Sequence, residues 1–293
     1  MRYRTCAAGL TLAFASAAAL ATPSPQGAGE LLARHASLQQ QLTASSFGRP
    51  IVLQSGDSAK NPHGDVYAEI RHPFAGVTSA LQPAQAWCDV MLLQTNVKRC
   101  VAAGDAASPT LRVSLVRKSS QSVEEAQQVE FRYTVRAASA TYLALEMKAD
   151  SGPVGTSDYS LTLEAVPLDA ERTFVHMSYA YANGLPARLA TETYLATSGR
   201  SKVGFSVTGR DESGQPVYVT GVRGIAERNT MRYYLAIEAV LAASKQPAAQ
   251  QLERRMDQWF SAVERYPRQL KEMERADYLA MKRRDLQVST TQR

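Results

Sequence analysis

Apolar and polar residues alternate along six segments of this chain, the pattern of strands that bury one face. The segments are residues 66–70, 110–116, 129–135, 141–147, 159–165 and 173–181. The last five are joined by short polar connections, so we expect neighbouring strands to pair antiparallel. Their apolar rows then share one concave surface. No crossover helix separates them, as a parallel sheet would require.

Helical spacing of apolar residues predicts further elements around these strands. A helix opens near Pro83 and carries Trp87, and residues 96–103 return as a strand. A short amphipathic helix in residues 30–42 precedes the first strand. Residues 225–244 form a helix that is apolar around more than half of its circumference, so it must be buried on most sides.

Three other segments have less regular patterns. Residues 185–199 are compatible with a helix, and residues 202–209 with a strand or an extended lid. In residues 250–284, apolar positions recur at helical spacing among interleaved acids and bases, with a break near Pro267. This tail either folds back onto the domain with a solvated charged face, or offers a transient contact to an anionic membrane or a protein partner.

The first residues have the composition of an export signal. Two arginines lie within the first four residues, an apolar run extends from Cys6 to Leu20, and small residues precede a cleavage point that we place after Ala21. We therefore expect an exported protein of the bacterial periplasm. The alternative is an uncleaved membrane anchor, but the run is shorter than the roughly 20 residues that span a bilayer.

Export changes how the cysteines are interpreted. Once Cys6 leaves with the leader, Cys88 and Cys100 remain, an even pair in a compartment where disulfides persist. The sequence favours a disulfide between them, and the alternative is two reduced cysteines buried as small hydrophobic residues. No histidine falls at zinc-ligand spacing with either cysteine, so we expect no metal site.

Composition and motifs narrow the function classes. The 33 Lys and Arg against 27 Asp and Glu give a formal net charge of +6, which falls to +4 without the two leader arginines. No block of five basic residues occurs, so nucleic-acid binding has little support. A nucleophile elbow, a P-loop, an HExxH motif and a dinucleotide fingerprint are all missing. The sequence favours a binding protein over an enzyme and predicts no catalytic residue and no cofactor.

The order of one strand, a helix with Trp87, an antiparallel meander and a long C-terminal helix resembles the START-like (SRPBCC) superfamily. Residues 83–100 and 221–241 carry the resemblance. It implies an α+β helix-grip fold, in which a curved antiparallel sheet grips the long C-terminal helix, with additional N- and C-terminal helices. The chain then divides into a signal peptide (1–21), a spacer with a short helix (22–63), the START-like domain (64–245) and a charged helical extension (246–293).

The resemblance also implies a hydrophobic cavity between sheet and helix. Family members bind or carry lipids, sterols, polyketides and other apolar molecules there, and a minority perform cyclase or hydrolase-type chemistry. Helix side chains can instead fill this space, as in most protein interiors. Tyrosines favour a cavity, because a buried hydroxyl needs a partner and can orient the polar head of a ligand. The predicted lining residues are Tyr133, Leu145, Met147, Tyr159, Leu161, Met177, Tyr179, Tyr181, Met231, Tyr234 and Leu235.

Charged residues offer further candidates for contact with a polar head group. These are His176, Arg228 and Arg232, with solvated or structurally paired side chains as the alternative. We expect a periplasmic START-like protein that binds or carries a lipid or another hydrophobic small molecule. One alternative is a cyclase- or hydrolase-type enzyme that uses the same cavity. The other is a non-catalytic interaction protein that acts through residues 250–284.

Overall fold

The computed structural model describes residues 27–56, 58, 60–105, 108–197 and 199–291. The predicted signal peptide and its cleavage point lie outside the described residues. The helices are α1 (Ala28–Thr43), α2 (Phe74–Leu81), α3 (Ala84–Leu92), a 3-10 turn η1 (Pro153–Gly155), α4 (Leu185–Ala196), α5 (Gly221–Ala243), α6 (Ala248–Glu264) and α7 (Arg275–Thr291). The strands are β1 (Ile51–Ser55), β2 (His63–Ile70), β3 (Val97–Ala103), β4 (Thr110–Leu115), β5 (Gln127–Ala138), β6 (Leu143–Ser151), β7 (Thr156–Pro167), β8 (Thr173–Asn183), β9 (Val207–Arg210) and β10 (Pro216–Tyr218).

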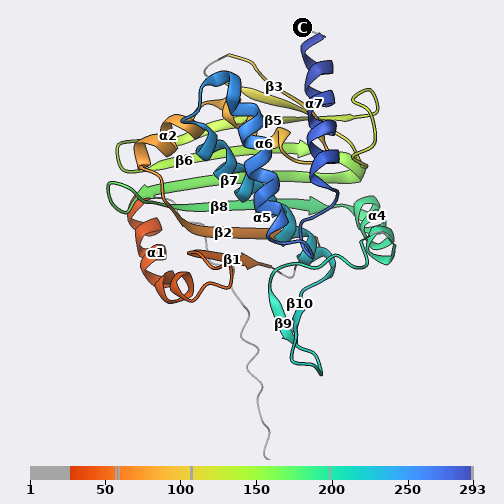
Figure 1. The fold of residues 1–293 in the computed structure, drawn as a ribbon, viewed down its shortest axis with the longest axis horizontal. Coiled ribbons are helices and arrows are strands. Elements are labelled where there is room, and N and C mark those ends of the chain that lie inside the picture. The colour runs from red at the N-terminus through yellow and green to blue at the C-terminus, as the bar shows by residue number, and fades with distance from the viewer. Residues whose placement is uncertain (1–26, 57, 59, 106–107, 198, 292–293) are drawn as a thin grey trace, which may run out of the picture.

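Eight strands form one antiparallel sheet in the order β1-β2-β8-β7-β6-β5-β4-β3 (Figure 1). Strands β3 to β8 follow one another as the expected meander, and β2 closes onto β8. The register places Leu145 opposite Leu163, and Leu163 opposite Met177, so apolar side chains run in rows across the strands. Strand β1, which the sequence pattern did not predict, extends the sheet beyond β2.

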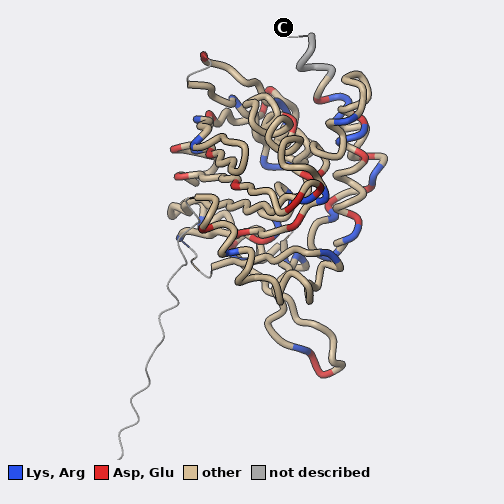
Figure 2. The backbone as a smooth tube through the Cα atoms, turned by 90° about the vertical axis from the view of Figure 1, so that its left-hand side faces the viewer, with Lys and Arg blue, Asp and Glu red and all other residues tan. Residues whose placement is uncertain are grey.

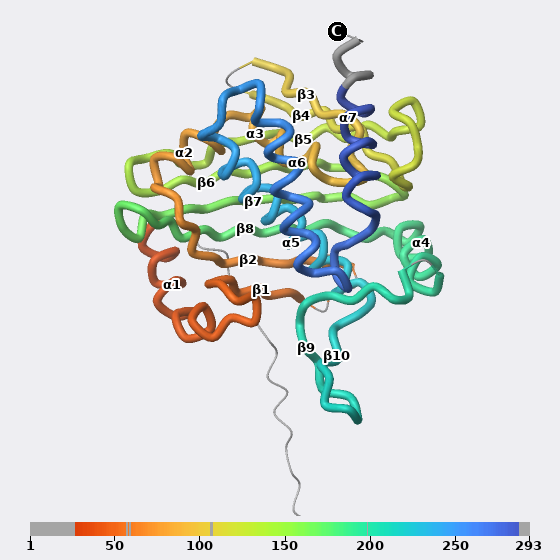
Figure 3. Tube along the Cα trace, viewed as in Figure 1, coloured from red at the N-terminus to blue at the C-terminus, as the bar shows by residue number. Residues whose placement is uncertain are grey.

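Helix α5 covers the apolar face of this sheet. It packs against β1, β2 and β8, while α3 covers β3 and β4 (Figure 3). Gly64 of β2 allows the close approach, because a Cβ atom there would lie 2.4 Å from Oγ1 of Thr230 in α5. The predicted α+β class, with an antiparallel sheet gripping a long helix, is confirmed. Helix α2, by contrast, was not predicted.

The tail folds back onto the domain. Helix α6 packs on α5, and α7 contacts both α6 and β3. The ring of Tyr278 in α7 lies 5.0 Å from that of Trp259 and 5.1 Å from that of Phe260, both in α6. Figure 2 shows Lys and Arg interspersed with Asp and Glu along these helices. A membrane or partner contact through the tail stays a prediction, and none of the helices described is long and apolar enough to cross a bilayer.

The opposite face of the sheet carries a smaller core under α1. Leu31, Leu38 and Leu42 pack there on side chains of β1, β2, β7 and β8. Strands β9 and β10 form a separate hairpin, which agrees with the strand alternative for this segment. The fully buried Glu227 of α5 anchors the chain before the hairpin, since its carboxylate accepts hydrogen bonds from the N–H groups of Phe205 (2.6 Å) and Ser206 (2.8 Å).

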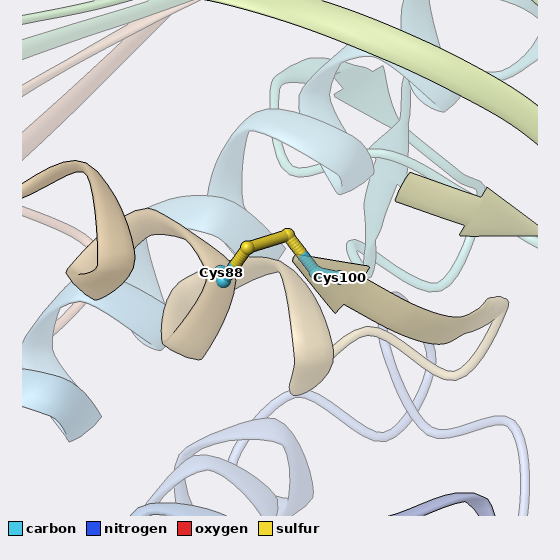
Figure 4. The surroundings of a disulfide bond; sticks show 2 residues. All are labelled: Cys88 and Cys100. Carbon is cyan, nitrogen blue, oxygen red and sulfur yellow. A yellow bond between two sulfur atoms is a disulfide. The ribbon is translucent and has the colours of Figure 1, made fainter. Parts of the chain in front are cut away.

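Cys88 and Cys100 form a disulfide that ties α3 to β3 (Figure 4). Their Cα atoms lie 5.1 Å apart, and both residues are buried in the main core. The predicted pairing is confirmed. The bridge closes a short loop, which restricts the unfolded chain.

Replacing Cys88 and Cys100 together with alanine should lower the free energy of unfolding by about 3 kcal/mol, the loop-closure value for a bridge of this span. Denaturant unfolding of the mature protein measures the difference. Treating the wild type with a reducing agent should lower its stability by a similar amount. Equal stability of the wild type and the double variant under oxidising conditions would show that the bridge contributes nothing.

The contact between α7 and the sheet contains a buried lysine. Nζ of Lys282 donates to the carbonyls of Gln94 (2.5 Å) and Val97 (2.7 Å), and the residue is 2% exposed. Burial, together with the charge of Lys98, lowers the pKa of Lys282 to about 7, although Asp285 acts in the opposite direction. Docking of α7 therefore places a titrating amine inside the protein near neutral pH.

This lysine should make stability rise with pH. Between about pH 7 and 10 the unfolded chain holds a proton on Lys282 that the folded protein has released, so the wild type should gain roughly 1.4 kcal/mol per pH unit relative to Lys282→Met. The variant also loses the two hydrogen bonds of Lys282. This loss shifts its curve of stability against pH by the same amount at every pH and leaves the slope unchanged. Urea unfolding across the pH range gives both profiles, and parallel profiles would contradict the assignment.

Candidate ligand cavity

A hollow of about 700 Å³ lies at the end of the sheet next to α4. Its walls come from β4, β5, β7, β8, the turn η1, and Asn229 and Tyr233 of α5. Helix α4 is held over this end because the N–H of Gly184 donates to the carbonyl of Gly155 in η1 at 3.3 Å. Ala187 and Ala190 turn small side chains of α4 toward the hollow, which leaves the space open.

Five of the aromatic rings that border this cavity form what we call the aromatic wall: Phe131, Tyr159, Tyr181, Tyr179 and Tyr233; the ring of Tyr194 on α4 also lines the cavity. Successive ring centroids are 6.1, 5.6, 5.7 and 5.3 Å apart in that order. The first pair meets edge to face, and Tyr159 stacks on Tyr181 at 15°. Such spacings are those of favourable aromatic pairs, so the wall is one continuous ring surface.

The phenols of the wall stay neutral at ordinary pH. Burial raises the pKa of Tyr181 to about 12, and it also raises the pKa values of Tyr159, Tyr179 and Tyr233. The hydroxyl of Tyr159 donates to Oγ1 of Thr156 at 2.7 Å. A ligand in this cavity therefore meets uncharged rings whose hydroxyl groups are hydrogen-bond donors.

Backbone strain is found beside the same cavity. Val154 in η1 has φ of 60°, in the left-handed region that β-branched residues avoid, and Asp158 in β7 has φ of 51°, which aspartate tolerates better. Val154 lines the cavity, and Asp158 lies in the irregular pairing of β7 with β8 just before Tyr159. Strain of this kind persists where surrounding contacts enforce it and is common at binding sites.

The charged side chains among the described lining residues of the cavity are all basic. Among the described residues that line it are Arg117 and Lys118, but no Asp or Glu. The described lining residues include no His or Cys either, the side chains that most often act as general base or nucleophile. The described residues also contain no group of three or more His, Cys, Asp or Glu that could hold a metal ion.

The sequence-predicted lining residues fall into two places. Tyr159, Tyr179 and Tyr181 border the cavity. The aliphatic members on the sheet and on α5 are instead buried in the main core: Leu145, Met147, Leu161, Met177, Met231 and Leu235. Tyr234 also lies there and donates its hydroxyl to Oε1 of Glu238 at 2.8 Å. Tyr133 donates to the carbonyl of Gln82. Contact of these residues with a ligand stays a prediction.

Sequence reasoning missed several residues that line the cavity. Phe131 shares the face of Tyr133 in an alternating strand, so the pattern contained its signal. Tyr233 precedes the buried Tyr234 on α5, and only the rotation of the helix against the sheet shows that it reaches the cavity. Ala187 and Ala190 contribute by being small, which no motif reveals.

A second hollow, of about 660 Å³, lies beside α5 and α6. Its central ion pair is closed, because the guanidinium of Arg49 binds both carboxylate oxygens of Glu238, at 2.7 and 2.6 Å. It has no aromatic ring among its described lining residues other than that of His72. The tyrosine-lined hollow is therefore the better candidate for an apolar ligand.

His176 lies away from the cavity. It alternates with Val175 and Met177 on β8, so it points to the face that α1 covers, where its ring stacks on Tyr67 at 4.3 Å. Its Nε2 lies 2.9 Å from Asp65 and its Nδ1 lies 3.1 Å from Glu164. Burial alone would lower the pKa of His176, but the two carboxylates outweigh it and raise that pKa. His176 is therefore a structurally paired side chain, which the sequence analysis gave as the alternative to ligand contact.

Asp65→Asn should lower the pKa of His176, measured from its imidazole signals by NMR, because one of the two carboxylates is removed. The histidinium pairing stabilises the fold fully below pH 6.5, the ordinary histidine value, and loses this effect as pH rises through the raised pKa. The variant should therefore lose roughly 2 kcal/mol of stability at acidic pH and less at alkaline pH. The exposed Asp277→Asn is the control, and an unshifted titration in Asp65→Asn would refute the pairing.

Comparison with known proteins gives weak likenesses. No protein-family model matches the sequence, and no curated protein matches it. Among solved structures it is similar to the Zhui aromatase/cyclase of a Streptomyces species, at 13% identity over 70% of this chain and 94% of that one, with a TM-score of 0.32. It is similar to human StAR-related lipid transfer protein 5 at 10% identity (58% and 90% covered, TM-score 0.30). A conserved Enterococcus faecalis protein of unknown function matches at 7% identity (80% and 99% covered, TM-score 0.34).

The fold rests on the strand order and on the helix across the sheet. One strand, two helices, a six-stranded meander and a long helix follow each other in the chain, and the first strand pairs with the last strand of the meander. The chain has a helix-grip fold of the α+β class. Relative to the minimal helix-grip arrangement, the chain adds α1 and β1 before the first strand, α4 and a hairpin before the long helix, and α6 and α7 after it.

Proposed function

We propose that this protein binds a hydrophobic small molecule in the cavity beside α4, as a carrier or binding protein of the START-like fold. The aromatic wall is the observation that carries the proposal. Five neighbouring rings border a hollow whose size falls within the usual range of ligand pockets, about 300 to 1,000 Å³. An apolar or aromatic ligand gains from replacing water on this surface, because ring contacts are favourable in themselves and bury large areas.

The lining supports binding in preference to chemistry. A neutral phenol is a poor base, and the described lining has no carboxylate, imidazole or thiol that could take up a proton or attack a substrate. The phenols and the amides of Asn183 and Asn229 instead offer a few polar contacts in a largely apolar space. A few fixed polar groups among apolar walls are typical of sites that orient a ligand.

The proposed location is the periplasm of a bacterium. The leader pattern of residues 1–21 supports export, and the disulfide between Cys88 and Cys100 is compatible with an oxidising compartment. A carrier of apolar molecules is useful there, because such molecules must cross an aqueous space between two membranes. Binding experiments, and not the location, identify the ligand.

A cavity-blocking variant tests the proposal. Ala190→Trp places a large ring from α4 into the hollow, and it should weaken binding of the neutral fluorophore phenylnaphthylamine by about tenfold or more, as followed by fluorescence titration. Ala249→Trp on the exposed surface of α6 adds the same ring elsewhere and should bind as the wild type does. Absence of binding by the wild type, or equal affinity of all three proteins, would contradict the proposed function.

A further inference from the structure

The second hollow, beside α5 and α6, has a basic lining. Its walls come from the chain before β1, the end of β2 with the residues that follow it, α5 and α6. The charged residues of the described lining are four arginines and two glutamates: Arg49, Arg71, Arg172, Arg265, Glu69 and Glu238. Burial and the charge of Lys245 lower the pKa of the lining residue His72, so it adds no charge near neutral pH. The lining therefore has two positive charges in excess.

Both glutamates of this hollow are fully engaged. Oε1 and Oε2 of Glu238 accept hydrogen bonds from Nη1 and Nη2 of Arg49, at 2.7 and 2.6 Å. Oε1 of Glu69 lies 2.7 Å from Nε2 of His35, and its Oε2 accepts a hydrogen bond from Nη1 of Arg172 at 2.8 Å. Neither carboxylate has an oxygen left without a basic partner.

Arg71 and Arg265 are the two cations in excess. Both side chains are exposed, and neither makes a hydrogen bond or an ion pair with the residues that the structure describes. Arg71 comes directly after β2 and Arg265 directly after α6, so the fold brings them to one hollow from distant parts of the sequence. The C-terminal end of α6 stabilises a cation at Arg265, whereas Arg71 lies at no helix end. Like charges on the walls of one hollow repel each other, and a bound anion removes that repulsion.

Small side chains keep this hollow open. Ala239 and Ala242 of α5 and Ala262 of α6 line it. Gln258 of α6 adds a neutral amide that can donate to an anion. The described lining has no Phe, Tyr or Trp. The hollow thus offers room and donors for a charged group and little surface for a large apolar one.

We propose that the second hollow binds a phosphate monoester, with Arg71 and Arg265 as the residues that hold the phosphate group. A monoester carries about −1.5 to −2 charges at neutral pH, which matches the two arginines in excess. A guanidinium can donate two parallel hydrogen bonds to such a group. The site is separate from the aromatic cavity, so this inference goes beyond the proposed function. The phosphate belongs either to a soluble molecule or to a lipid head group.

Calorimetric titration of the mature protein with glycerol phosphate, at low ionic strength so that screening is weak, tests the site. Arg71→Met combined with Arg265→Met should weaken binding by about tenfold or more, because charge-assisted hydrogen bonds are lost. Arg254→Met combined with Arg284→Met removes the same charge from exposed positions of α6 and α7 and should bind as the wild type does. Ala242→Glu keeps both arginines but adds a carboxylate to the lining, and should also weaken binding by about tenfold or more.

Vesicles identify the source of the phosphate. Phosphatidic acid presents the same monoester on a bilayer, so the protein is tested for cosedimentation with phosphatidylcholine vesicles that contain phosphatidic acid. Cosedimentation of the wild type and the control pair, with loss in the Arg71 and Arg265 pair, supports the site with a lipid head group as ligand. Binding of glycerol phosphate without cosedimentation supports the site with a soluble ligand.

Two results would overturn the inference: no binding of either probe by the wild type, or equal binding by the wild type and the Arg71 and Arg265 pair. The melting temperature of this pair should be nearly unchanged, because the two exposed side chains have no partner to lose. All variants should bind phenylnaphthylamine as the wild type does. Failure of the phosphate site therefore leaves the proposed function intact.

Discussion

The structure depends on burial of one apolar sheet face by one helix. A sheet with a single apolar face is stable only if another layer covers it. Helix α5 has 23 residues and a length of about 34 Å, enough to cross several strands. It approaches β2 closely at Gly64, and its own outer side is apolar, so it needs cover in turn. Helices α6 and α7 supply that cover, which is why the tail belongs to the main core and is more than an appendage.

The cavity forms where these helices leave one end of the apolar sheet face uncovered. Helix α5 packs on β1, β2 and β8, and α3 packs on β3 and β4, so neither fills the end of the sheet where β5, β7 and β8 reach η1. Helix α4 spans this end with small residues, and it contacts the turn η1, where the backbone of Val154 is strained. Tyrosines occupy the strand ends because their rings can remain buried while their hydroxyls face polar space. The site is thus a consequence of helix placement.

The sequence predicted the fold better than it predicted the site. Alternation along β5 to β8 and the apolar stretch of α5 follow from burial of one face, a strong constraint on residue type. The disulfide was predicted from the even number of cysteines that remain if the chain is exported. The site depends instead on helix rotation and on side-chain size. Tyr159 and Tyr181 were accessible to sequence reasoning as tyrosines on an apolar sheet face, whereas Met147 on the same face and Leu235 on α5 are simply packed. Arg228 and Arg232, the charged candidates on α5, are not among the described residues that line the cavity: Arg228 is buried, and Arg232 binds Glu272.

A crystal structure of the mature protein with phenylnaphthylamine tests the central claim most directly, because it shows where an apolar ring system comes to rest. The account predicts that the fluorophore lies between α4 and the aromatic wall, stacked against Tyr159 or Tyr181, with the α5 core unchanged around Met147 and Leu235. Density for the fluorophore only in the hollow beside α6, or α4 collapsed onto the wall with side chains filling the space, would contradict it.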